Sequence, residues 1–243
     1  MPTYQTTGII IGRTNFGEAD RVIRFLTPDR GKLSAVAKGV RKIRSRAAGH
    51  LELFGEASLM LAVGRNLDIV TSARLLWYPH QLATDYDRLG LAFAMATAVD
   101  RLTEPDQPQP VLYALLGEAL RAIDAGATGP LPELWFKLRL LQILGYRPQL
   151  QACLVCGRRD GATDYAFSPD RGGIVCATDA GATDLAMPVQ TIKFWRVLSD
   201  HDHATAAQIT EANNLAASSL SLCDAFYEYH LGRAFRPGQL GAG

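Results

Sequence analysis

The sequence predicts an α+β chain of several domains, in which a small N-terminal barrel precedes an all-α region carrying a zinc-ribbon-like cysteine motif. Three observations support this fold class. Five short segments of alternating apolar and polar residues lie between residues 7 and 75, and beyond Tyr78 the apolar spacing changes from two to about 3.6. Three of the four cysteines fall within residues 153–176. The alternation is typical of strands, and the longer spacing is typical of helices.

The first three strands are predicted at residues 7–14, 21–27 and 32–38. Pro28, Asp29 and Gly31 are residue types that favour the tight turn between the second and the third. Strands at 57–63 and 67–75 complete the set. Five short strands with one long connection after the third suit a closed or partly open barrel. We predict a five-stranded OB-fold barrel, and a Greek-key or SH3-like barrel fits almost as well.

Helices are predicted at residues 82–102, 111–125, 130–144, 189–199 and roughly 209–235, because apolar residues recur there at three- and four-residue steps. We interpret those apolar positions as core. An insert rich in Gly, Asp and Thr over residues 149–187 carries the cysteine motif. The predicted domains are therefore an OB-fold nucleic-acid-binding domain over 1–78 and a helical domain over 79–243 that contains the insert.

The composition excludes several classes of protein. Of the 243 residues, 48% are apolar and 20% charged, which is typical of globular chains and excludes wholesale disorder. The longest mostly apolar window, residues 89–99, is far shorter than the roughly 20 residues of a membrane span, and the N-terminus lacks a basic leader. We therefore expect a cytoplasmic protein without a membrane partner. Phosphate-binding glycine loops, dinucleotide fingerprints and nucleophile elbows do not occur in the sequence, so we expect no enzyme.

Positive charge is concentrated near the N-terminus, although the net charge is only +1. Residues 1–50 contain ten Lys and Arg against three acidic residues, and residues 38–46, here called the basic loop, contain five cations and no acid. Such a cluster repels itself unless an anion neutralises it, which favours nucleic-acid phosphates bound without base readout. A solvated loop is the alternative. The candidate DNA contacts are Lys38, Arg41, Lys42, Arg44 and Arg46 in the loop, with Arg13, Arg30 and Lys32 on neighbouring strands and turns.

Aromatic residues give a weaker signal. Tyr4 and Phe16 are candidates for stacking on bases, whereas Phe25 and Phe54 are expected to fill the barrel core. If each of the five loop cations neutralises about one phosphate of a single strand, log K should fall against log salt with a slope of roughly −3.5. The sequence thus predicts binding to the backbone rather than to a particular base sequence.

The spacing of the cysteine motif is nearly that of a zinc ribbon. A Cys-x-x-Cys turn presents two thiolates to one tetrahedral ion, and a carboxylate can complete the site, although oxygen is a harder donor than sulfur. The candidate zinc ligands are Cys153, Cys156, Cys176 and Asp179. Two other interpretations stay open: a metal-free ribbon in which Tyr165, Phe167, Ile174 and Val175 fill a small satellite core, and a redox Cys-x-x-Cys pair. Cys223 lies among apolar residues and is expected to be a buried helix residue.

These features together resemble the RecO family of bacterial recombination mediators. The residues that carry the resemblance are Thr7-Gly-Ile-Ile-Ile, Gly17-Glu-Ala-Asp-Arg-Val-Ile, Thr27-Pro-Asp-Arg-Gly-Lys-Leu, Ala37-Lys-Gly-Val-Arg-Lys, Leu53-Phe and Leu144-Gly-Tyr-Arg-Pro. The resemblance spans essentially the whole chain and is most specific in residues 7–55 and 140–157. Asp179 departs from the family pattern, which has a fourth cysteine at this position.

The resemblance implies a non-enzymatic role in DNA repair. Members of the family bind single- and double-stranded DNA, anneal complementary strands and, with RecR, help RecA to displace single-strand-binding protein, which implies a location at the nucleoid. The acidic tail of single-strand-binding protein would need an apolar groove beside cations, and the region of Lys137, Arg139 and Arg147 is the expected place. The alternative is a protein-interaction scaffold in which the basic loop is merely solvated.

Overall fold

A computed structural model describes residues 1–45, 47–159 and 164–232. These residues divide into two compact units, 1–126 and 127–232. The first unit contains a barrel and two long helices, and the second contains a helical group with a small sheet. Helices α1 (Tyr86–Leu102) and α2 (Pro110–Asp124) therefore belong to the same unit as the barrel. No helix among the described residues is long and apolar enough to cross a membrane.

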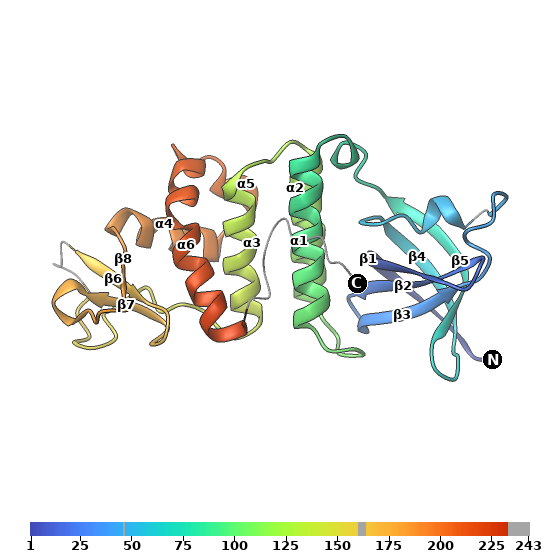
Figure 1. Ribbon diagram of the computed structural model, residues 1–243, viewed down its shortest axis with the longest axis horizontal. Coiled ribbons are helices and arrows are strands. Elements are labelled where there is room, and N and C mark those ends of the chain that lie inside the picture. The colour runs from blue at the N-terminus through green and yellow to red at the C-terminus, as the bar shows by residue number, and fades with distance from the viewer. Residues whose placement is uncertain (46, 160–163, 233–243) are drawn as a thin grey trace. The chain divides into compact units, whose positions relative to one another are not determined.

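Five strands form a closed barrel in the first unit: β1 (Thr3–Phe16), β2 (Asp20–Thr27), β3 (Gly31–Ala37), β4 (Glu56–Ala62) and β5 (Asp68–Trp77). Their order around the barrel is β1-β2-β3-β5-β4, and β3 and β5 are parallel whereas the other neighbours are antiparallel (Figure 1). This five-stranded closed barrel confirms the predicted OB-like fold. Strict alternation of burial along β3 is the period-two pattern that predicted the strand.

The barrel interior is filled by apolar side chains from every strand. Ile10, Ile23, Phe25, Leu33 and Leu59 are among its buried members. Two further members come from the long β3–β4 connection, namely Val40 and Leu51, which are 3% and 1% exposed. Val40 near the start of the connection and Leu51 near its end therefore pack into the barrel core, and this burial stabilises the unit.

Two helices, α1 (Tyr86–Leu102) and α2 (Pro110–Asp124), pack together beside the barrel (Figure 1). The predicted helix start at residue 82 was too early. A 3-10 turn, Leu82–Thr84, comes first, and then Asp85 takes an extended conformation. Its carboxylate accepts hydrogen bonds from the backbone N–H groups of Asp87 and Arg88 at 3.0 and 3.2 Å, so Asp85 is the N-cap at which the α-helix begins.

The second unit contains α3 (Pro130–Ile143), α4 (Val189–Asp200), α5 (His203–Ala206) and α6 (Ala212–Leu231). Its small sheet has the order β7-β6-β8, from β6 (Tyr165–Ser168), β7 (Gly173–Cys176) and β8 (Leu185–Ala186) (Figure 1). The last predicted helix starts later than expected, at residue 212, because Glu211 before it has a left-handed backbone conformation with a φ of +61°. Asp202 caps the separate short helix α5 by accepting a 2.8 Å hydrogen bond from the Thr205 N–H. Cys223 is fully buried on α6, as predicted.

The predicted satellite core of the cysteine insert is not separate. Tyr165, Phe167, Ile174 and Val175 are all buried. However, the ring of Phe167 contacts Trp195 of α4 and Phe226 of α6, at centroid distances of 5.3 and 5.6 Å. The sheet therefore shares its core with the helices, because a three-stranded sheet with strands of two to four residues has too little apolar area of its own.

Candidate nucleic-acid interface and cysteine cluster

The basic loop is held in a defined conformation by consecutive turns. Gly39 has a φ of +65°, which favours glycine, and its carbonyl accepts a hydrogen bond from the Lys42 N–H at 3.1 Å. The Lys42 carbonyl in turn accepts from the Ser45 N–H at 2.9 Å. Val40 between these turns is buried in the barrel core. These turns and the burial of Val40 brace the loop.

Three hydrogen bonds fix the loop against the β1–β2 turn. The Gly39 N–H donates to the Asp20 carboxylate at 2.7 Å, and the Arg41 N–H donates to the Ala19 carbonyl at 2.9 Å. The guanidinium of Arg41 donates to the Gly17 carbonyl at 3.1 Å. The basic loop and the β1–β2 turn thus form one surface, and the β1–β2 loop is one that OB-folds use to bind oligonucleotides.

Four predicted DNA contacts, Lys38, Arg41, Lys42 and Arg44, are exposed on this surface. Within the described ranges, none of the four forms an ion pair with a carboxylate. Arg46, the fifth, lies outside the described residues. Because their charges are not neutralised within the described chain, the four cations form a concentrated anion-attracting patch.

The three candidates outside the loop have different surroundings. Arg13 pairs with Glu52 at 2.6 Å, and Lys32 pairs with Asp100 of α1 at 3.6 Å. Arg30 is exposed, and its guanidinium lies 3.9 Å from the centre of the Tyr4 ring. Arg13 and Lys32 are therefore already neutralised by carboxylates of the same unit, whereas the charge of Arg30 faces solvent.

The aromatic candidates also differ in their exposure and contacts. Phe16, at the end of β1, is 55% exposed. The ring of Tyr4 is covered by Arg30, and its hydroxyl donates to Asp68; burial and that carboxylate raise the pKa of Tyr4 well above its ordinary value. Phe25 fills the barrel core as predicted, whereas Phe54 packs edge-on against Phe93 of α1, with ring centres 5.0 Å apart.

Ile43 is an apolar residue that the sequence analysis overlooked. It lies between Lys42 and Arg44 and is fully exposed, the most exposed large apolar side chain among the described residues. An isolated apolar residue on a surface is ordinary, and only its position inside a run of cations distinguishes it. That position was visible in the sequence, but its exposure was not.

The four candidate metal ligands come together in the second unit. One ligand atom each from Cys153, Cys156, Cys176 and Asp179 lies within 4.8 Å of all the others. The Sγ atoms of Cys156 and Cys176 are 3.7 Å apart, and Cys153 Sγ is 3.4 Å from Asp179 Oδ2. A tetrahedral zinc with bonds of about 2.3 Å to sulfur and about 2.0 Å to oxygen has edges of about 3.8 and about 3.5 Å. The cluster therefore has dimensions suited to a metal ion.

The backbone around the cluster favours a thiolate at Cys153. Burial opposes ionisation of this thiol, but backbone N–H groups of Cys156, Cys176 and Val155 point at its sulfur and lower its pKa overall. Burial raises the pKa of Cys176 to about 11, and the two neighbouring cysteines add to this shift. Crowded thiols of this kind are stabilised when a cation takes the place of their protons.

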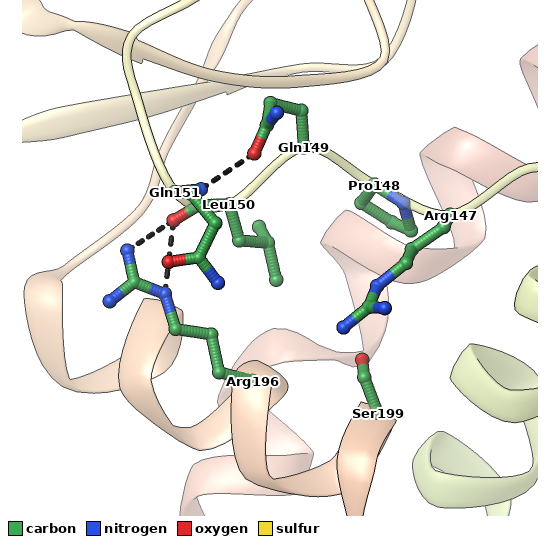
Figure 2. Close-up of a pocket in the computed structure, with 7 residues that line it drawn as sticks. All are labelled: Arg147, Pro148, Gln149, Leu150, Gln151, Arg196 and Ser199. Carbon is green, nitrogen blue, oxygen red and sulfur yellow. Dashed lines mark hydrogen bonds between the residues drawn. The ribbon is translucent and has the colours of Figure 1, made fainter. Parts of the chain in front are cut away.

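A cavity of about 360 Å³ lies in the second unit between α4 and the segment that follows α3. Figure 2 shows its arginines, Arg147 and Arg196, on either side of Pro148 and Leu150. The Arg196 guanidinium donates to the Leu150 carbonyl, and Arg147 pairs with Asp200 at 2.6 Å while remaining half exposed. The cavity thus combines two apolar residues and two arginines with the polar side chains of Gln149, Gln151 and Ser199.

Only one of the three cations expected beside an apolar groove lines this cavity. Arg147 does, whereas Lys137 is buried and paired with Glu133 and Asp224. Arg139 donates to the Ser199 carbonyl at 2.8 Å. Arg196, which the sequence analysis did not single out, is the second cation of the cavity because α4 packs next to the segment after α3.

The family models and the similar proteins named below all indicate the same family, and together they cover nearly the whole chain. The family model for the recombination protein O N terminal matches residues 1–78, and that for the recombination protein O C terminal matches residues 83–237. A protein of Roseiflexus sp. named DNA repair protein RecO is 40% identical over 232 residues, which cover 95% of this chain and 82% of that protein. A protein of the same name from Bifidobacterium adolescentis is 32% identical, and the match covers 99% of each chain. Another from Nocardioides sp. is 36% identical, and the match covers 90% of this chain and 93% of that protein.

Proposed function

This chain belongs to the RecO family of DNA repair proteins, and from that premise we propose that it is a non-enzymatic recombination mediator that binds DNA through the basic loop. Family membership supports a role in DNA repair and recombination. The observation that carries the molecular proposal is the set of four exposed cations on a braced loop beside the β1–β2 turn, none of which forms an ion pair with a carboxylate of residues 1–45, 47–159 or 164–232. The proposed phosphate contacts are Lys38, Arg41, Lys42, Arg44 and Arg46 in the basic loop, with Arg13, Arg30 and Lys32 as weaker candidates.

Cations of this kind suit a mediator because phosphates are the same in every sequence. A protein that acts at any gap or break must bind without reading bases, and charged side chains on a barrel achieve this. Binding to single and double strands, annealing of complementary strands and assistance to RecA loading with RecR follow from this proposal as activities to be tested.

The test is charge reversal in the loop. The variant Arg41→Glu/Lys42→Glu/Arg44→Glu should lose binding to oligonucleotides of any sequence, measured by fluorescence anisotropy, while its circular dichroism spectrum is unchanged. A matched control reverses two exposed arginines elsewhere on the barrel, Arg65→Glu/Arg74→Glu, and should retain most of the affinity. Undiminished binding by the loop variant, or salt-insensitive capture of protein partners without oligonucleotide retention, would instead favour the scaffold function.

The cavity between Arg147 and Arg196 is the proposed docking site for the acidic, apolar-ended tail of single-strand-binding protein. Pro148 and Leu150 suit an apolar end group, and the guanidinium groups of Arg147 and Arg196 suit carboxylates, although the peptide must then compete with Asp200 for Arg147. Arg147→Glu should weaken binding of a labelled acidic peptide that ends in phenylalanine, while oligonucleotide binding is unchanged. Equal peptide affinity in both proteins would contradict this assignment.

Zinc is the ion proposed for the cysteine cluster. The support is that three sulfur atoms and one carboxylate oxygen lie within 4.8 Å of one another, that two of their spacings, 3.7 and 3.4 Å, match the edges of a zinc tetrahedron, and that zinc accepts this donor set. The role proposed for the ion is to stabilise the small sheet, because the cluster links the 153–156 turn to the end of β7. A redox function for Cys153 and Cys156 would be favoured only if alkylation of these thiols abolished an activity.

A further inference from the structure

We propose that Ile43 and Phe16 contact the faces of unstacked bases, so that the basic end of the barrel prefers single-stranded to double-stranded DNA. This inference rests on the proposed function and adds a substrate class to it. It begins from the two large apolar side chains that are exposed within the cationic surface, Ile43 at full exposure and Phe16 at 55%.

The two side chains belong to segments that hydrogen bonds hold together. Phe16 immediately precedes Gly17, whose carbonyl accepts a hydrogen bond from Arg41, and Ile43 lies two residues beyond Arg41. The backbone around Ile43 is fixed by the turns that join Gly39 to Lys42 and Lys42 to Ser45. Ile43 is thus presented at full exposure by a braced loop, so little conformational entropy is lost when it meets a ligand.

The setting distinguishes this pair from scattered surface apolar residues. Lys42 and Arg44 on either side of Ile43 are exposed and have no carboxylate partner in the described chain. A ligand that satisfies both features carries anions and apolar surface at close spacing. A nucleic-acid strand with unstacked bases has both, because each nucleotide offers one phosphate and one base.

A duplex can contact the cations of this site but not its apolar side chains. Its phosphates are available, but its base faces are stacked on one another and can be reached only if the steps are opened at additional cost. The cations therefore bind both forms of DNA, and the apolar pair adds affinity only for the single strand. The tyrosine candidate does not take part, because Arg30 already covers the ring of Tyr4.

The experiment compares single- and double-stranded oligonucleotides of the same sequence by anisotropy titration of the full chain. Phe16→Ser should weaken single-strand binding about tenfold and Ile43→Ser about fivefold, and neither should change duplex binding more than about twofold. Val111→Ser, at a 60% exposed apolar residue on α2, is the control and should leave both affinities unchanged. A thymine-rich strand with a 2-aminopurine probe gives a second readout, because contact with Ile43 or Phe16 should change its fluorescence.

Failure of this inference is distinguishable from failure of the proposed function. If Phe16→Ser and Ile43→Ser reduce both affinities equally, or leave the single-strand affinity intact, the base-contact assignment is wrong even though the loop cations bind DNA. If charge reversal at Arg41, Lys42 and Arg44 leaves both affinities unchanged, the proposed function itself is wrong. Thermal melting of each variant establishes that folding is retained, as expected for exposed positions.

Discussion

The ammonium group of Lys137 on α3 lies 2.6 Å from the carboxylate of Asp224 on α6, and this pair joins the two helices. Glu133, one turn earlier on α3, is the second partner of the same ammonium. The Lys137 side chain is only 1% exposed. A buried lysine of this kind is tolerated because two carboxylates compensate the loss of its hydration.

Removal of this charge should destabilise the second unit. Lys137→Met keeps most of the side-chain volume but leaves Glu133 and Asp224 without their shared cation, so the free energy of unfolding should fall by about 2–4 kcal/mol. Urea denaturation followed by circular dichroism measures this. The variant Lys137→Met/Glu133→Gln/Asp224→Asn removes the unpaired charges as well and should recover part of the loss. No recovery would mean that packing, not charge, dominates at this site.

The same lysine predicts a dependence of stability on alkaline pH. Burial lowers the pKa of Lys137, but Glu133, Cys223 and the hydrogen bond to Asp224 outweigh that effect, and the pKa is raised above its ordinary value of 10.5. The folded chain therefore holds this proton more tightly than the unfolded chain. The stabilisation is complete below pH 10.5 and is lost as the pH rises through the higher folded value. Melting of Lys137→Met should lack this part of the alkaline decline.

Neutralisation of the basic loop should change the salt dependence of DNA binding in proportion to the contacts removed. Arg41→Gln/Lys42→Gln/Arg44→Gln removes three cations, so the slope of log K against log salt for a single strand should become shallower by roughly 2. Anisotropy titrations between low and moderate salt measure both slopes. An unaltered slope would show that these side chains do not displace counterions.

Asp100 restrains two cations of the barrel, pairing with Arg24 at 3.1 Å and with Lys32 at 3.6 Å. Asp100→Asn removes the carboxylate partner of both cations, although Lys32 still donates to the backbone carbonyl of residue 100, and should steepen the salt dependence by up to about 1.4 if both groups reach phosphate. Asp87→Asn, at an exposed carboxylate on the same helix, is the matched control. If the two variants bind alike, Lys32 is a purely structural residue.

Two glycines with similar backbone conformations should respond differently to alanine. Gly31 has a φ of +64°, and an added Cβ would lie 1.8 Å from the Gln107 carbonyl oxygen, whereas Gly17 has a φ of +61° and open space around it. Gly17→Ala should cost about 1 kcal/mol, for the backbone conformation alone. Gly31→Ala should cost clearly more, because the 105–110 segment must also move. Equal melting temperatures of the two variants would contradict the close contact.

Substitutions in the cysteine cluster should change how much zinc the chain binds and how tightly the zinc is held. Elemental analysis should find about one zinc per chain in the wild type, less in Cys156→Ser and a chelator-resistant ion in Asp179→Cys, because sulfur is the softer fourth ligand. The thermal stability of the second unit should follow the same order. A wild type that holds no zinc after purification with zinc present would leave the ribbon held by packing alone.

The barrel was predictable from sequence because its signal is local. Alternation in residues 32–38 and the Pro28-Asp-Arg-Gly turn each depend on neighbours along the chain, and the observed β3 differs from its prediction by one residue at each end. The basic loop was predictable for the same reason, since five cations without an acid can be counted. The predicted helix starts were less accurate. Asp85 and Asp202 each act as an N-cap only because the carboxylate reaches backbone N–H groups of the next turn, and apolar spacing does not reveal that contact.

Ion pairing was decided only by the tertiary structure. Arg13 and its partner Glu52 are 39 residues apart, and Lys32 and Asp100 are 68 residues apart. No pattern within a strand reveals such partners, because Coulomb attraction depends on distance in space. The sequence by itself determined the barrel, the concentration of charge and the four ligand types of the cysteine cluster. Folding decided which cations pair with carboxylates among the described residues, that Lys137 is buried, and that Ile43 faces solvent between two cations.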